Sequence, residues 1–568
     1  FMGIRAGVLA LVVKAFNRRR AGRVWLEEKA ANGDITHVFF SSDRIAMLLA
    51  EDIRRCRPQH SLILVAFPDP EDNYADMSLW ERMKSLFRFR VDMDKGPFDA
   101  VVYSSVALNE ISGEGVCRQM NLGALDAFLK RAENKVYFLS ADELMNIRCA
   151  ELLRSDGCVA EIYCHACGEG INRRYAVAME HTPSVRTHFV DSSYLALRNL
   201  FTREELLPVN FVEKGRDENG LIEGWVASDF AAMVVGFGET GREALRFLYE
   251  YAAFVGKDRR KSPFSCLAVD GKMHEIQQEF CRAYPGLTAE AGVSYLQSDL
   301  SSDVFWKALE GIVTKLNYVV VSLGDDRLNL KLAIDIVEFA HRKGRDLSDK
   351  FVVLVEQKRQ GSLDELTLDY YNSIDVYHSC IKTFGAEEDV WTYDNITNES
   401  VTGRAKRFFA GYNMACNAVD YDAAMALWDA REHEIATCTD LRLHEKRVRQ
   451  RSQDYANCFH VACKKALMGP EILDNALAVA AGIPGRYDEK IGHCTHEDGH
   501  IVKIMDYHAV YEHVRWEASH VALGYAPGPD TDEILKTHKF IMAYDELSGE
   551  IRHYDYLVVK TTLGVVGD

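Results

Sequence analysis

The chain has 568 residues, of which 48% are hydrophobic, and a formal net charge of −18 at pH 7. A chain of this length forms about three to four domains. No stretch of it reaches the roughly 20 apolar residues that a membrane-spanning helix needs. The negative charge argues against non-specific nucleic-acid binding as the main activity, and solubility alone accounts for it.

The first segment, residues 1–30, contains an apolar run from Ala6 to Val13, followed by Lys14 and by Arg18–Arg20. It lacks the cleavage site of a signal peptide. Two interpretations stay open. The segment is either an amphipathic helix of a soluble domain or the cytoplasmic end of a membrane helix that begins before Phe1. Basic residues just past an apolar run fit the second interpretation, because cytoplasmic flanks are enriched in them.

Between residue 31 and about residue 400, short apolar strands alternate with helical periodicity, which predicts parallel α/β sheets. We expect two tandem Rossmann-like domains with doubly wound parallel sheets, at 31–206 and 225–400. The expected strands lie at 36–43, 61–67, 98–105, 134–143 and 160–166 in the first domain, and at 231–238, 265–270, 292–299, 317–326 and 350–357 in the second.

One motif occurs in both halves. The stretch "VYFLSADELMNIRCAELL" (136–153) aligns with "VVVSLGDDRLNLKLAIDI" (319–336). Each copy is a strand followed by two acids and an asparagine, which are Asp142, Glu143 and Asn146 in the first copy and Asp325, Asp326 and Asn329 in the second. The match predicts an internal duplication, with both motifs at strand ends where doubly wound sheets bind ligands. The alternative is a chance similarity between two crossovers.

The stretch "MVVGFGETGREALRFL" (233–248) reads as strand, glycine turn and helix, the dinucleotide-binding fingerprint. Gly236 permits the tight turn, Gly238 lets the backbone approach a pyrophosphate, and Gly241 allows close packing of helix on strand. The helix N-terminus offers free N–H groups to an anion, and Asp270 follows the next strand, where an acid accepts ribose hydroxyls. The corresponding turn of the first domain has no glycine, so we expect that domain to be structural or to bind something different.

The motifs "VVGFGETG", "AVD", "QSD" and "VVVSLGDDRLN" resemble the regulator-of-K⁺-conductance (RCK, TrkA-N) family of Rossmann domains. The resemblance implies a nucleotide ligand, such as NAD/NADH, ATP/ADP or a nucleotide second messenger, and a homo-oligomer. The implied nucleotide-binding residues are Gly236, Phe237, Gly238, Glu239, Thr240, Gly241, Asp270, Asp299, Gly324, Asp325 and Asn329.

After about residue 400 the strand pattern stops. Helical periodicity at 405–419, 422–438 and 445–469 predicts a helical linker region over 401–500. The arginines at 447, 449 and 451 indicate a solvated helix face.

The last segment, 501–568, contains "YEHVRWEASHVALGYAPGPDTD" (511–532) and "KTHKFIMAYDELSGEIRHYDYLVVKTTL" (536–563). These stretches resemble the repeat domain of ryanodine receptors (RyR). Their cations and aromatic rings suit a base and a phosphate. The alternative is a small aromatic core, or a module that joins subunits. The candidate binding residues are Arg515, Trp516, Tyr525, Tyr544 and Tyr554, with His538 beside them.

Two further motifs are interpreted as non-functional. "HEDGH" (496–500) matches H-E-x-x-H, but Asp498 and Gly499 are poor helix residues and no third ligand is evident. Cys164 and Cys167 form a CxxC pair without the second pair that structural zinc sites usually show. We therefore expect neither catalytic nor metal-binding residues.

These observations predict a regulatory, non-enzymatic protein that senses a nucleotide and resembles the cytoplasmic gating part of a nucleotide-regulated ion channel or transporter, potassium transport included. By analogy the role is in bacterial antiphage defence or stress signalling, at the cytoplasmic face of the inner membrane, with a membrane pore as partner. The alternatives are an NAD(P)-dependent oxidoreductase, which needs a catalytic group over the cofactor, and a soluble oligomeric scaffold.

Overall fold

A computed structural model describes residues 24–67, 91–104, 125–167, 187–359, 361–490 and 493–567. The chain forms two compact units. The first consists of Phe1–Leu195 together with Glu387–Thr397, and the second of Ala196–Ala386 together with Asn398–Asp568. Residues 1–23, which carry most of the proposed amphipathic or membrane-proximal segment, lie outside the described residues.

The first unit is built on a seven-stranded sheet with the order β3-β4-β2-β1-β5-β6-β7. Only β3 runs antiparallel to its neighbour, at the edge of the sheet. The strands are β1 (Thr36–Phe39), β2 (Ser61–Ala66), β3 (Val91–Lys95), β4 (Phe98–Tyr103), β5 (Lys135–Phe138), β6 (Glu161–His165) and β7 (Thr187–Val190), and the main helices are α2 (Arg44–Cys56), α5 (Asp126–Leu129) and α6 (Glu143–Ser155).

The second unit contains a six-stranded parallel sheet with the order β12-β11-β10-β13-β14-β15. Its strands are β10 (Phe230–Val235), β11 (Phe264–Asp270), β12 (Val293–Gln297), β13 (Tyr318–Val321), β14 (Val352–Glu356) and β15 (Ile381–Phe384). Both sheets thus follow the 3-2-1-4-5-6 order of doubly wound folds. The expected fold class, two Rossmann-like domains in tandem, is confirmed, and the structure adds β3, β7 and β15 to the predicted strands.

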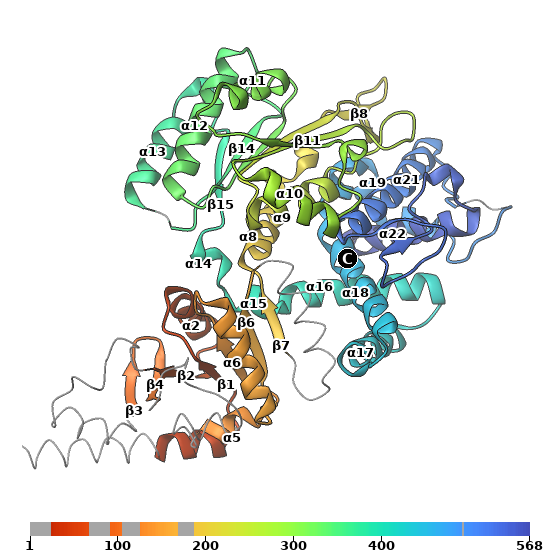
Figure 1. Ribbon diagram of the computed structural model, residues 1–568. Coiled ribbons are helices and arrows are strands. Elements are labelled where there is room, and N and C mark those ends of the chain that lie inside the picture. Colours follow the sequence, from red (N-terminus) through yellow and green to blue (C-terminus); the bar gives the residue numbers. More distant parts are fainter. Residues whose placement is uncertain are drawn as a thin grey trace, which may run out of the picture. The chain divides into compact units, whose positions relative to one another are not determined.

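Helices cover both faces of the second sheet (Figure 1). The connections are α9 (Glu239–Tyr251), α10 (Met273–Ala283), α11 (Asp303–Ile312), α12 (Asp326–Arg342) and α13 (Ser362–Asn372). Every residue of β10 and β14 is buried, as expected for strands of a sheet that is covered on both faces. Apolar residues of α11 and α12 pack on β13 and β14 in one continuous core.

The two domains share two pairs of asparagines in equivalent positions. Asn134 and Asn317 stand just before β5 and β13. Each accepts a backbone N–H near the start of the neighbouring strand, from Thr36 of β1 (2.9 Å) and Ala231 of β10 (2.9 Å) respectively. Asn146 and Asn329 stand at the opposite end of the same strands, in the duplicated motif.

Asn146 donates to the carbonyl oxygens of Ser140 (2.8 Å) and His165 (3.0 Å) and accepts the Ser140 N–H. Asn329 donates to the carbonyl of Glu356 (2.8 Å) and accepts the Leu323 N–H (2.6 Å). In both domains the motif asparagine therefore connects the ends of two neighbouring strands, β5 and β6 in the first domain and β13 and β14 in the second.

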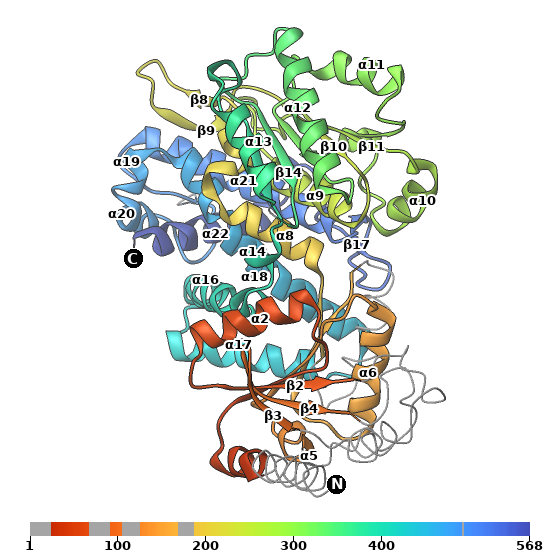
Figure 2. The ribbon, with the colours of Figure 1, turned by 90° about the vertical axis from the view of Figure 1, so that its left-hand side faces the viewer.

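The remaining part of the second unit is mainly helical. It comprises α16 (Glu399–Asn417), α17 (Tyr421–Thr437), α18 (Leu441–Met468), α19 (Pro470–Leu473), α20 (Ala476–Ala481), α21 (Gly499–Ala522) and α22 (Gly549–Gly567), with a short strand pair β16 (Ala526–Pro527) and β17 (Thr537–His538). Helices α19, α20 and α22 lie together (Figures 1 and 2) and share an apolar core with α21. Among the described residues, no helix is both long and apolar enough to cross a bilayer.

The short segment Glu387–Thr397, with α14 (Glu387–Val390) and α15 (Tyr393–Thr397), returns to the first unit. Arg44 of α2 forms ion pairs with Glu387 (2.6 Å) and Glu388, and the Asp52 carboxylate accepts the Tyr393 N–H (2.7 Å). These contacts explain why the segment packs with the first sheet although the chain has already passed through the second.

Candidate functional site

The glycine turn after β10 is the first candidate site. Gly236 has φ = +88°, and a Cβ there would lie 2.1 Å from the Ser322 carbonyl oxygen. At Gly241, on the first turn of α9, a Cβ would lie 1.9 Å from the Gly236 carbonyl oxygen. At Gly238, by contrast, a Cβ would meet no atom within 4 Å. The three glycines thus have three different geometries: a tight turn, an open approach and a close helix–strand contact.

The turn leads directly into the N-terminus of α9, for which Gly238 is the capping residue. Gly238 and Glu239 are exposed, so the backbone at the start of the helix faces open space. The first N–H groups of a helix lack partners within the helix, and the helix dipole favours an anion beside them. This end of α9 therefore has the geometry of a phosphate-binding helix terminus.

Thr240, in the same turn, is buried and donates its hydroxyl to Glu356 at the end of β14 (2.9 Å). Burial raises the pKa of the Glu356 carboxyl, while Lys358 and the bond from Thr240 act against that rise. Protonation of this carboxyl would remove a negative charge beneath the helix N-terminus.

The acidic candidates accept backbone N–H groups. Asp270 accepts from Phe237 (2.8 Å) and Lys272 (2.7 Å). Asp299 accepts from the Ser301 hydroxyl and the Ser301 N–H (2.7 Å), and these two bonds hold the pKa of Asp299 below its usual value. Because a carboxylate can accept more than two hydrogen bonds, these contacts leave Asp270 able to accept a ribose hydroxyl as well.

The remaining candidates of the second domain have mostly structural roles. Asp325 caps α12 by accepting two backbone N–H groups, Gly324 has φ = +81°, and Asn329 is the tie described above. The Phe237 ring is fully buried against Phe280. These residues, Asp270 and the glycine turn all stand at the carboxyl ends of β10, β11 and β13. The strand order reverses between β10 and β13, and doubly wound sheets bind ligands at such a point.

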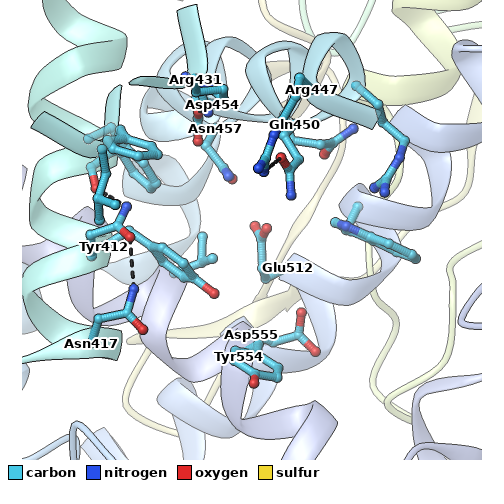
Figure 3. A pocket seen from close by; sticks show the side chains of 18 of the residues that line it. Tyr412, Asn417, Arg431, Arg447, Gln450, Asp454, Asn457, Glu512, Tyr554 and Asp555 are labelled. Atoms are coloured by element: carbon cyan, nitrogen blue, oxygen red, sulfur yellow. Dashed lines mark hydrogen bonds and ion pairs between the residues drawn. The ribbon is translucent and has the colours of Figure 1, made fainter. Parts of the chain in front are cut away.

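A pocket of about 710 Å³ in the helical region is the second candidate site (Figure 3). Its volume lies within the range of small-molecule sites. Its wall combines aromatic rings with charged and amide side chains from α16, α17, α18, α21 and α22. The polar lining residues labelled in Figure 3 are Tyr412, Asn417, Arg431, Arg447, Gln450, Asp454, Asn457, Glu512, Tyr554 and Asp555.

The three arginines of the wall are paired with carboxylates of the chain. Arg431 pairs with Asp454, Arg447 donates to Glu434 (2.5 Å), and Arg449 forms two bonds to Glu533 (2.9 and 3.0 Å). The expectation of a solvated arginine face was therefore wrong: the side chains of Arg447 and Arg451 are about 70% buried and that of Arg449 more so, because α17 and the loop after α21 supply acidic partners.

The buried polar atoms of this wall without a hydrogen-bond partner include both donors and acceptors, and the donors are Nε and Nη2 of Arg431. Among the described residues, Gln453 Oε1 and Asn457 Oδ1 are buried without a hydrogen-bond partner, and Asn457 points into the cavity (Figure 3). Burial raises the pKa of Asp454 to about 6 despite its pairing with Arg431. Burial, together with the neighbouring Glu512, also raises the pKa of Asp555 well above its ordinary value. The pocket thus favours a ligand that brings both hydrogen-bond donors and acceptors.

The structure separates the five candidates of the last segment. Trp516 and Tyr554 line the pocket, as does His538. Arg515 is fully buried and pairs with Glu512 (2.6 and 3.0 Å), which also binds Lys464 (2.7 Å). Tyr525 is buried and donates to Glu533 (2.6 Å). Tyr544 packs against Arg552.

Sequence reasoning missed most of the pocket, including Tyr412, Arg449 and Asn457. The sequence predicts the helices that carry these residues, but it does not predict how the five helices pack to form the pocket. The H-E-x-x-H match is not a helical pair: Asp498 caps α21, which begins at Gly499, so that His496 precedes the helix and His500 lies within its first turn.

Helix α9 connects the two candidate sites within the second unit. Arg246 donates to the Ala522 carbonyl at the end of α21 (2.9 Å). Glu250, near the end of α9, faces His460 of α18 (3.5 Å), whose ring stacks on Tyr251. The helix that begins at the glycine turn therefore packs against two of the helices that line the pocket.

Comparison with known proteins adds little to this geometry. No protein-family model and no curated protein matches the chain. Among solved structures, a crystal structure of a GsuK mutant is similar at 14% identity and a TM-score of 0.32, over 63% of this chain and 67% of that chain. A similarity at this level supports no argument about a ligand, so the fold assignment rests on the strand order of the two sheets.

Proposed function

We propose that the protein is a ligand-sensing regulatory protein that binds a nucleotide at the glycine turn of its second Rossmann-like domain. The observation that carries the proposal is the open backbone at Gly238, between a turn that requires Gly236 and a helix contact that requires Gly241. Phosphate groups of the nucleotide would accept N–H groups at the start of α9, and Asp270 would accept a ribose hydroxyl.

A regulatory role is favoured over an oxidoreductase for a chemical reason. A dehydrogenase needs a general acid or base over the cofactor. At this edge of the sheet, Asp299 and Asp325 accept backbone N–H groups and act as structural residues, and Asp270, which accepts the Phe237 N–H, is the proposed ribose acceptor. The contacts of α9 with α18 and α21 instead give a bound nucleotide a route to influence the helical region, as a sensor requires.

The ligand class is tested by calorimetry on the whole chain with NAD, NADH, ATP, ADP, AMP and ADP-ribose. Gly238→Arg places a long side chain where the nucleotide would lie, and Gly311→Arg adds the same side chain on α11, where a Cβ also has no neighbour within 4 Å. We expect at least about tenfold weaker binding, or 1.4 kcal/mol, for Gly238→Arg only. Equal affinities of the two variants, or no binding by any nucleotide, would refute the proposal.

The pocket of the helical region is the second candidate receptor, and its unpartnered buried donors and acceptors favour it. A ligand with an aromatic ring and several donors, such as a nucleoside, would stack on Trp516 or Tyr554 and donate to Asn457 and Gln453. Tyr554→Ala, with Tyr421→Ala as an exposed control outside the pocket, separates this site from the glycine turn. Loss of binding only in Tyr554→Ala would identify the pocket as the receptor.

The effector of the sensor is a further part of the proposal. The RCK-like motifs of the sequence favour a membrane pore or transporter, potassium channels included, and a homo-oligomer. The RyR-like motifs favour a role in bacterial defence or stress signalling. Reconstitution of the full-length protein in vesicles, with ion flux measured before and after nucleotide addition, tests the membrane effector directly.

A further inference from the structure

The first domain, which lacks the glycine turn, has a cluster of possible metal ligands at the corresponding edge of its sheet. Among the described residues, Glu143, His165 and Cys167 form a group in which one ligand atom from each lies within 4.8 Å of the other two. Cys167 Sγ and His165 Nε2 are 3.3 Å apart. Thiolate, imidazole and carboxylate are the ligands that zinc takes in proteins.

The duplicated motif positions two of these residues. Asp142 caps α6 and so fixes Glu143 at the first position of the helix. Asn146 binds the His165 carbonyl and so holds the end of β6 beside that helix. In the second domain the equivalent asparagine holds Glu356, and Asp326 takes the place of Glu143. The first domain has therefore kept the scaffold and changed the side chains that it presents.

Contacts around the group orient its ligand atoms. His165 Nδ1 lies 3.4 Å from the Ser140 carbonyl oxygen. A carbonyl only accepts, so Nδ1 carries the proton, and the lone pair of Nε2 faces Cys167. Metal-binding histidines are typically fixed by such a bond to a carbonyl or carboxylate. The Ser192 hydroxyl lies 3.2 Å from Cys167 Sγ, where it can donate to a thiolate.

We propose that Glu143, His165 and Cys167 bind a zinc ion at the carboxyl edge of the first sheet, with solvent as a further ligand. The ligand atoms of a tetrahedral zinc site, with bonds of about 2.0–2.3 Å, lie about 3.3–3.8 Å apart. The observed pair of Cys167 and His165 at 3.3 Å meets this requirement, and the Glu143 carboxylate, within 4.8 Å of both, would move closer when the ion binds. Binding displaces the thiol proton of Cys167 to solvent, and no oxidation or reduction takes place.

The CxxC pair supplies its own control. Cys164 is fully buried in the apolar core of the first domain, whereas Cys167 faces His165. The two cysteines therefore lie in different environments and are not arranged as a zinc knuckle, in which both would bind one ion. Cys56, which is exposed, serves as a control for binding by surface thiols.

The test is a titration of the reduced full-length chain with Co²⁺, followed by displacement with Zn²⁺. We expect one equivalent of Co²⁺ per chain, with a thiolate-to-cobalt charge-transfer band in the near ultraviolet. Cys167→Ser should abolish the band, and His165→Gln should weaken binding at least about tenfold. Cys164→Ala and Cys56→Ser should leave both the band and the affinity unchanged.

Circular dichroism of each variant separates loss of the site from loss of the fold. If Cys167→Ser does not fold, Glu143→Gln becomes the deciding variant, because Glu143 lies in the first turn of a helix and is half-buried. It should keep the thiolate band but bind Co²⁺ more weakly. A complex without a thiolate band, or a band that persists in Cys167→Ser, would overturn the proposal.

Discussion

The hydroxyl of Thr240 donates a hydrogen bond to the buried carboxyl of Glu356, 2.9 Å away, and so joins the first turn of α9 to the end of β14. The bond spans the reversal point of the second sheet, where the proposed nucleotide lies. Glu356 has a side chain only 4% exposed, and burial raises its pKa. Ionisation of this group therefore opposes both the folded state and a phosphate nearby.

Glu356→Gln is expected to stabilise the second unit at neutral and higher pH. A carboxyl whose folded-state pKa is raised contributes stability below its unfolded pKa of about 4.5, and this contribution is lost as pH rises through the folded pKa. Because the amide does not titrate, the stability of the variant relative to the wild type should increase as pH rises. Each 1 kcal/mol of this difference corresponds to roughly 2–4 °C in Tm. Thermal unfolding between pH 4 and pH 8 measures this, with the exposed Glu365→Gln as control.

The glycine turn gives a prediction about two alanine substitutions that differ only in their surroundings. Gly241→Ala would place a Cβ 1.9 Å from the Gly236 carbonyl oxygen, and it should destabilise the second unit by about 3 kcal/mol or more. Gly238→Ala meets nothing within 4 Å and should change stability by less than about 1 kcal/mol. Chemical denaturation distinguishes them, and equal stabilities would contradict the packing role of Gly241.

The equivalent asparagines predict a matched pair of effects. Asn146→Ala and Asn329→Ala each remove bonds that tie the fourth strand to the fifth. Each should cost about 1–3 kcal/mol, because the backbone groups left behind are at least partly buried. Hydrogen exchange resolves the two domains: Asn146→Ala should reduce protection in β5 and β6 only, and Asn329→Ala in β13 and β14 only. Each variant serves as the control for the other.

The buried charge cluster beneath the pocket gives a pH-dependent prediction. Burial opposes ionisation of Glu512, but Arg515 and Lys464 together outweigh it and lower its pKa to about 2. A depressed pKa contributes stability above the unfolded value of about 4.5, and that stability is lost as pH falls toward 2. Glu512→Gln should cost about 3–5 kcal/mol at pH 7 by leaving two buried cations without their carboxylate.

Denaturation of Glu512→Gln at pH 7 and at pH 3 checks this expectation. The difference from the wild type should be largest at pH 7 and should shrink at pH 3, as the wild-type carboxylate approaches its own pKa. The exposed Glu550→Gln is the control. A difference that does not depend on pH would show that Glu512 acts through packing alone.

The sequence predicts those parts of the fold that depend on local requirements of the backbone, such as strands, helix starts and tight turns. Runs such as "FAAMVV" predict covered parallel strands, and the duplicated acids and asparagine predict equivalent helix starts. The roles of Gly236 and Gly241 also follow from local geometry, since each position excludes a Cβ. Asn134 and Asn317 were overlooked, although each begins the predicted strand that leads into its copy of the motif.

The pocket could not be predicted in this way, because it depends on contacts between distant segments. Arg449 and Glu533 pair across 84 residues, and this pairing turns an apparently solvated arginine into part of a wall. The sequence does not show that Arg515 is buried in an ion pair with Glu512, which also binds Lys464. Cys164 lies in the apolar core, whereas Cys167 faces His165. This difference depends on how the chain leaves β6, which the spacing of the two cysteines does not predict.

The return of Glu387–Thr397 to the first unit has a consequence for protein engineering. The chain passes from one unit to the other three times, at 195–196, 386–387 and 397–398. Neither unit is therefore encoded by an uninterrupted stretch of gene. A truncation after residue 386 would remove the strip that covers α2 together with the whole helical region, and a fragment that starts at residue 196 would carry that strip without its sheet. Dissection of this protein into functional parts calls for circular permutation or insertion of protease sites, in place of simple shortening from either end.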